Sequence, residues 1–172
     1  YCPFGCYHTE SMAHLLNGCI KTFGNFYSRR HNRVVEKIAE YLENCRPTCR
    51  VYQEKQSETL LPFLRYELLN IVNRRPDIHV VDEISKSFIL IEISVCYDLY
   101  LDYAYEAKKE RYAPLIRCLN GNGYSATLIV LCFGSLGSVR NNIWNDLKQF
   151  SDDKVLLKNT IKACSISNII GS

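Results

Sequence analysis

Apolar residues recur at helical spacing in the segment 29–45, which predicts an amphipathic helix. The positions on its apolar face are Val34, Val35, Ile38, Tyr41 and Leu42. Basic side chains gather at the start of this segment, where the dipole of a helix disfavours cations. They are Arg29, Arg30, His31 and Arg33. An external phosphate would relieve this conflict, so we expect an anion to bind at the start of the helix.

Four shorter apolar segments predict β-strands. They span residues 49–54, 76–81, 87–95 and 125–134. The second and third are joined by the short polar link 82–86, which predicts a β-hairpin. The fourth is almost entirely apolar, which is typical of a buried strand.

Two further helices complete the pattern. The segments 97–121 and 138–150 have helical spacing, and the first ends at a glycine, a common stop signal. Segment 59–72 is compatible with a helix or with an irregular insertion, and 151–172 is weakly patterned. The order of the elements predicts an α/β fold, a mixed sheet of about four strands flanked by helices.

The composition of the 172 residues fits one globular domain with a small appendage. No apolar run is long enough for a transmembrane helix, and the first residues lack the pattern of a signal peptide. The nine cysteines favour a reducing compartment with metal-binding thiols over a disulfide framework. The net charge of +3 is compatible with nucleic-acid binding without requiring it. Because the chain does not begin with Met, we expect it to be part of a longer polypeptide.

Four potential metal ligands lie close together near the N-terminus, namely Cys2, Cys6, His14 and Cys19. Zinc in structural sites takes four thiolate or imidazole ligands in a tetrahedron. A segment this short cannot build a core of its own, so a metal would supply its folding energy. We therefore expect a zinc knuckle over residues 1–24, with His8 as an alternative to His14. Incidental cysteines are the simpler alternative.

The predicted hairpin would bring two carboxylates together. If it is symmetric about its link, Val81 faces Phe88. By the same register Asp77 faces Glu92, on one face of the sheet. Opposed side chains have Cβ atoms ~5 Å apart, so two buried carboxylates there repel each other. A divalent cation such as Mg²⁺ would resolve this, and so would an ion pair with the arginines at 74–75; register alone leaves both open.

The next predicted helix supplies a lysine. Its inward face carries Lys108, Tyr112, Leu115 and Leu119. An inward lysine needs a carboxylate partner, which Asp77 or Glu92 could provide. A lysine whose amine reaches out to solvent is the simpler alternative. Two carboxylates and an amine are the groups that metal-assisted phosphodiester hydrolysis needs.

Two short motifs resemble the PD-(D/E)xK nuclease superfamily: Pro76-Asp77 and Glu92-Ile93-Ser94, although Ser94 stands where that motif usually has a lysine. The Cys/His cluster, “RRHNRVV”, Asp77, “IEISV” and “AKKERY” follow one another along the chain. This order is similar to the C-terminal region of site-specific non-LTR retrotransposons of the ribosomal-DNA-inserting type. In that family a zinc knuckle precedes a restriction-like endonuclease. The resemblance covers roughly residues 1–150.

The resemblance implies a restriction-endonuclease-like core over residues 25–150, followed by a C-terminal tail at 151–172. It implies that Asp77, Glu92 and the Ile93 carbonyl bind Mg²⁺ or Mn²⁺. It also implies that the catalytic lysine is Lys108, displaced from position 94. The DNA-contacting residues that it implies are Arg29, Arg30, His31, Asn32, Arg33, Arg111 and Tyr112. Candidates for an additional acid are Glu36 and Glu54.

The expected activity is the nicking of target DNA to leave a 3′-hydroxyl. This end would prime reverse transcription by a polymerase domain located upstream in the same polypeptide, in the nucleus or nucleolus. The expected partners are double-stranded target DNA and element RNA, without a membrane. One alternative is a catalytically decayed module of the same fold that binds DNA or element RNA, which the missing lysine at position 94 favours. Another is a zinc-stabilised interaction domain with no nucleic-acid role.

Overall fold

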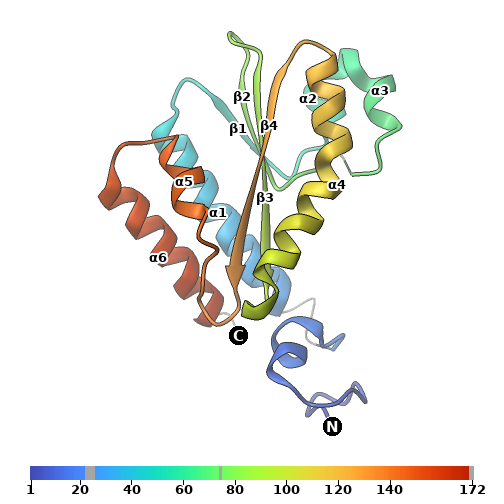
Figure 1. Cartoon of the computed structure of the whole chain (residues 1–172), viewed down its shortest axis with the longest axis vertical. Coiled ribbons are helices and arrows are strands. Elements are labelled where there is room, and N and C mark those ends of the chain that lie inside the picture. Colours follow the sequence, from blue (N-terminus) through green and yellow to red (C-terminus); the bar gives the residue numbers. More distant parts are fainter. Residues whose placement is uncertain (22–25, 74, 171–172) are drawn as a thin grey trace.

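The computed structural model describes residues 1–21, 26–73 and 75–170, which form a central β-sheet with helices on both faces and a small N-terminal lobe (Figure 1). The strands, in their order across the sheet, are β1 (Arg50–Gln53), β2 (Ile78–Asp82), β3 (Ser87–Cys96) and β4 (Ser125–Gly134). The pairs β1–β2 and β2–β3 are antiparallel, and β3–β4 is parallel. The predicted α/β fold with a mixed four-stranded sheet is therefore confirmed.

The α-helices in the described residues are α1 (Ser28–Cys45), α2 (Ser57–Leu60), α3 (Arg65–Leu69), α4 (Leu101–Gly121), α5 (Ile143–Lys148) and α6 (Lys154–Ile170). Shorter turns lie at His14–Gly18, Pro62–Leu64 and Asp98–Tyr100. Helices α1, α5 and α6 pack on one face of the sheet, and α2 to α4 pack on the other (Figure 1). Helix α4 connects β3 to β4, because parallel strands need a crossover.

Side chains of the hairpin alternate between two cores. Ile91 and Ile93 of β3 pack against α1, whose predicted apolar face is buried as expected. Phe88 and Leu90 pack on the opposite face with the inward stripe of α4. Glu92 follows the same alternation and faces α4, inside an otherwise apolar layer.

The C-terminal segment 151–172 was expected to be a tail, and this prediction was wrong. Residues 154–170 form α6, which buries Leu157, Ile161 and Cys164 in the core beside α1. Asp153 caps the helix, since its carboxylate accepts hydrogen bonds from two backbone N–H groups at 2.9 Å. The core domain therefore extends past residue 150.

Two other predicted boundaries differ. Segment 59–72, for which a helix and an irregular insertion were both left open, contains the end of α2 and all of α3, which are separated at Pro62 because proline cannot continue a helix from the preceding turn. Segment 138–150 is helical only from Ile143 to Lys148. The loop before this helix is held by the Asp98 carboxylate, which accepts hydrogen bonds from the N–H of Leu136 at 2.9 Å and from the N–H of Ser138 at 3.2 Å. The predicted end of the knuckle at residue 24 lies outside the described residues. Within the described ranges, none of the helices has the length and apolar character to cross a bilayer.

Candidate active site and metal centre

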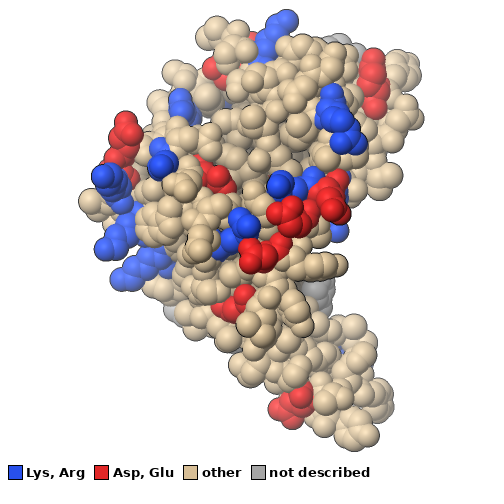
Figure 2. Space-filling model, viewed as in Figure 1, with Lys and Arg blue, Asp and Glu red and all other residues tan. Residues whose placement is uncertain are grey.

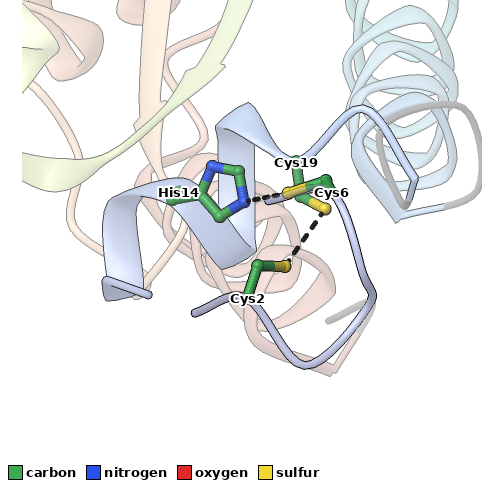
Figure 3. Close-up of side chains that lie close together, drawn as sticks. All are labelled: Cys2, Cys6, His14 and Cys19. Atoms are coloured by element: carbon green, nitrogen blue, oxygen red, sulfur yellow. Dashed lines mark hydrogen bonds between the residues drawn. The ribbon is translucent and has the colours of Figure 1, made fainter. Parts of the chain in front are cut away.

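The predicted Cys/His cluster is assembled in the N-terminal lobe (Figure 3). The ligand atoms of Cys2, Cys6, His14 and Cys19 all lie within 4.8 Å of one another. The Sγ atoms of Cys2 and Cys19 are 3.7 Å apart, close to the ~3.8 Å edge of a zinc tetrahedron with Zn–S bonds of ~2.3 Å. Cys6 Sγ and His14 Nε2 are closer, at 3.0 Å. This group could bind a metal such as zinc.

Among the described residues, the apolar cluster of the N-terminal lobe is built around the candidate metal ligands. Its buried side chains are the three thiols, with Leu15 packed against them. A tight turn brings the first two ligands together: Gly5 has a φ of 72°, and its N–H donates to the carbonyl of Cys2 at 3.1 Å. His8 stays outside the cluster, with its ring 5.2 Å from that of His14. The spacing argument therefore selected the right histidine.

Arg30 joins the lobe to the core domain. Its side chain is fully buried, and one guanidinium nitrogen donates to the carbonyl of Leu16. A second contact runs from the Asn17 amide to the Ser135 hydroxyl at 3.0 Å. Arg30 was expected to contact a DNA phosphate. The structure does not support this, because a guanidinium that is enclosed between the lobe and the helix does not reach a DNA backbone.

Asp77 lies directly before the first residue of β2. The register pairs Ile78 with Ile91, which confirms the predicted hairpin and sets Asp77 opposite Glu92 one step further. Because β2 begins only at Ile78, the N–H of Ile93 has no strand partner on that side. Asp77 Oδ2 accepts this N–H at 2.7 Å. The carboxylate thus continues the ladder and is held in a fixed orientation.

Glu92 pairs with Lys108, as the inward stripe of α4 predicted. Oε1 of Glu92 accepts a hydrogen bond from Lys108 Nζ, and the glutamate is only 3 % exposed. Burial raises the pKa of Glu92, and the charge of Asp77 raises it further, although Lys108 acts in the opposite direction. Oε2 of Glu92 is buried without a hydrogen-bond partner among the described residues. Such an unsatisfied acceptor is unusual in a protein interior.

The expected alternative, an ion pair of the acids with the arginines at 74–75, is not what the described residues form. Arg75 pairs with Glu54 at 2.8 Å, and Arg74 lies outside the described residues. The cation beside Glu92 is Lys108. The neighbour of Asp77 is His31 of α1.

Three aromatic side chains surround the acids. His31 Nε2 lies 3.3 Å from Asp77 Oδ2; burial lowers the pKa of His31, but the hydrogen bonds and charge around it, with Asp77 first among them, outweigh burial and raise the pKa. Tyr112, expected at DNA, is instead buried and donates to the Arg75 carbonyl at 3.0 Å. Tyr27, which the sequence analysis missed, stacks on His31 with ring centroids 6.2 Å apart. Its spacing of one helical turn from His31 was the available signal.

The remaining candidates lie at the surface. Arg29, Asn32, Arg33 and Arg111 are exposed, as a phosphate contact requires. Glu36 and Glu54 line a shared hollow of about 230 Å³ together with Asn32. Figure 2 shows basic side chains gathered on the side where α6 lies, whereas acidic and basic side chains are mixed over α4. The face shown in Figure 2 is therefore not uniformly cationic.

The acid pair offers ligands of the kind that Mg²⁺ prefers. Two carboxylates and the Ile93 carbonyl are hard oxygen donors, and the unpartnered Oε2 of Glu92 is a natural ligand for an ion. Among the described residues, however, only the Cys/His cluster brings three or more metal-binding side chains together. An ion at Asp77 and Glu92 would need the carbonyl, water or a substrate phosphate to complete its shell.

A scan against protein-family models found no match for this chain, and a search of the curated proteins found no similar sequence. Its function therefore has to be argued from the residues themselves.

Proposed function

We propose that this chain is a metal-dependent DNA endonuclease that nicks target DNA and leaves a 3′-hydroxyl. The observations that carry the proposal are the contact between Glu92 and Lys108 and the position of Asp77 directly before β2, from where its charge raises the pKa of Glu92. A buried carboxylate pair with one amine is costly to maintain, because burial and mutual repulsion both oppose the charged forms. Perturbed ionisable groups of this kind cluster at functional sites.

In the proposed reaction a water oxygen attacks phosphorus and the bond from phosphorus to O3′ breaks. The leaving oxygen takes a proton and becomes the 3′-hydroxyl, while the phosphate stays on the 5′ end. Asp77, Glu92 and the Ile93 carbonyl would hold Mg²⁺ or Mn²⁺, which supplies an acidified water and neutralises phosphate charge. Lys108 orients the attacking water and stabilises the charge that develops on the phosphate.

Exposed arginines supply the contacts to DNA in this proposal. Arg29 and Arg33 lie in the first turns of α1, and Arg111 lies on α4. Contacts of this kind fix the position of a duplex without reading its sequence. The metal-binding lobe adjoins α1 through Arg30, so it lies close to the same stretch of nucleic acid.

The wider context is also part of the proposal. The nick would prime reverse transcription of a non-LTR retrotransposon by an upstream polymerase domain, in the nucleus or nucleolus, with element RNA as a second partner. The support is the order of motifs, from the Cys/His cluster through Asp77 and Glu92 to Lys108.

A plasmid-nicking assay in Mg²⁺ tests the proposal. Lys108→Ala and Asp77→Asn should each lower the nicking rate at least a hundredfold, since each removes a group that acts on the phosphate or its ion. Lys109→Ala is the matched control, because Lys109 is exposed and contacts Glu106 and the ring of Tyr105 and not the acids. Nicking by Lys108→Ala at the wild-type rate would overturn the mechanism.

The second candidate is a module that binds DNA or RNA without cutting it. Ser94 favours it, because the lysine usual at that position is absent. A wild-type protein that binds DNA with the salt dependence of phosphate contacts, but does not nick it in Mg²⁺ or Mn²⁺, would establish this candidate.

A further inference from the structure

His31 lies against both main-chain and side-chain oxygens at the start of β2. Its Nε2 is 3.3 Å from Asp77 Oδ2 and 3.3 Å from the carbonyl oxygen of Ile93. The imidazole is largely buried, and the ring of Tyr27 stacks on it. One side chain thus touches two of the three groups that would bind the cation.

The break in the sheet explains why His31 is there. In an extended strand the N–H and C=O of one residue point to the same side, and β2 stops before it reaches Ile93. Asp77 accepts the Ile93 N–H at 2.7 Å, which leaves the Ile93 carbonyl to be satisfied by another donor. The polar group that lies within hydrogen-bond distance of this carbonyl is His31 Nε2, at 3.3 Å.

The contacts of Nε2 also define its chemical role. Both neighbours, Asp77 Oδ2 and the Ile93 carbonyl, are acceptors, so Nε2 carries a proton and has no lone pair for a metal. Each acceptor oxygen has two lone-pair sites. Asp77 Oδ2 already accepts from Ile93 N–H and from His31, so both of its sites are occupied while His31 is in place.

We propose that His31 is a positioning residue that takes the place of the divalent cation, holding Asp77 and the Ile93 carbonyl in place until the cation binds and His31 withdraws. This inference rests on the proposed function for the identity of the ion. It adds a form of regulation, because Oδ2 of Asp77 is closed to a cation whenever the imidazole is bound. It also separates His31 from the DNA-contacting role expected from the sequence.

Manganese affinity tests the inference without any activity measurement. The full chain, with its Cys/His cluster loaded with zinc, is titrated with Mn²⁺ while free Mn²⁺ is followed by electron paramagnetic resonance. His31→Ala should bind Mn²⁺ on the order of tenfold more tightly than the wild type, since the cation no longer displaces hydrogen bonds of ordinary net strength. Asn44→Ala, an exposed neutral residue near the other end of α1, is the matched control and should bind as the wild type does.

A second measurement on the unaltered chain guards against misfolding of the variant. In the nuclear magnetic resonance spectrum, Mg²⁺ should shift the imidazole signals of His31. The signals of His79, which is buried and bonded to Ser57, should stay in place. A His31 signal that Mg²⁺ leaves unchanged, although the ion binds, would overturn the displacement.

The outcomes separate this inference from the function on which it rests. Weaker Mn²⁺ binding by His31→Ala would make the imidazole a ligand, and equal binding would make it a bystander; either result overturns the inference and leaves the nuclease intact. Wild-type protein that binds no Mn²⁺, or binds it equally well as Asp77→Asn, would remove the metal site and both proposals with it.

Discussion

Replacement of Lys108 by methionine should destabilise the protein more than neutralisation of its partner does. The Glu92 side chain is 4 % exposed and that of Lys108 is 20 % exposed. Lys108→Met leaves a buried carboxylate next to Asp77 with no cation, and breaking a buried pair in this way costs about 3 kcal/mol or more. Glu92→Gln leaves an amine that can extend to solvent and removes the repulsion by Asp77, so it should cost no more than about 1 kcal/mol.

Urea denaturation, followed by circular dichroism, measures these losses. For a protein of this size, a loss of about 3 kcal/mol also lowers Tm by roughly 6–12 °C. The double variant Lys108→Met/Glu92→Gln should be about as stable as Glu92→Gln alone, because it contains no unpaired buried charge. Lys109→Met, on the exposed side of the same helix, should stay within about 0.5 kcal/mol of the wild type.

Two results would refute the reasoning. Equal losses in Lys108→Met and Glu92→Gln would show that the carboxylate is not confined in a dry environment. A double variant whose loss equals the sum of the single losses would show that the two side chains do not interact. Either result would also weaken the argument that the acid pair is kept for a functional reason.

Three further predictions concern the parts around the site. Zinc removal by a chelator should open residues 1–21 to protease while the sheet domain stays resistant. Mass spectrometry of the fragments measures this, and a lobe that remained uncut would contradict it. Ile161→Ala should lower the free energy of unfolding by about 2–4 kcal/mol, measured in urea; no loss would mean that α6 does not pack on the core. Arg30→Met should speed hydrogen exchange in the turn at His14–Gly18 without changing the zinc content, whereas unchanged exchange would show that Arg30 does not hold the lobe.

The acid pair and its lysine were predictable because they obey local rules. A hairpin with a short link has few registers, so Asp77 and Glu92 could be paired by counting. Lys108 lies on a clear helical stripe that ends in buried leucines. In each case the residue and its partner belong to neighbouring elements. The two-residue period of a strand and the 3.6-residue period of a helix are then enough to predict which side chains face each other.

Other features depend on partners that the sequence does not mark. Arg30 looks like a surface cation, yet it is buried because its partner is a backbone carbonyl in a lobe that a metal would organise. Helix α6 was missed because exposed apolar residues obscure its buried stripe. Val155 is 69 % exposed and Ile169 is 52 % exposed, whereas Leu157 and Ile161 are buried. When exposed and buried apolar residues are mixed in this way, the hydrophobic periodicity of the helix cannot be recognised in the sequence.

The late start of β2 gives the site its location and its chemistry. β2 begins only at Ile78, and the residue that would face Ile93 in the same register is Pro76, which has no N–H to donate to the Ile93 carbonyl. An acid and an imidazole therefore take the place of backbone partners at the edge of the apolar core. Arg30, the residue before His31, anchors the metal-binding lobe. The first turn of α1 therefore contacts the lobe through Arg30 and Asp77 through His31.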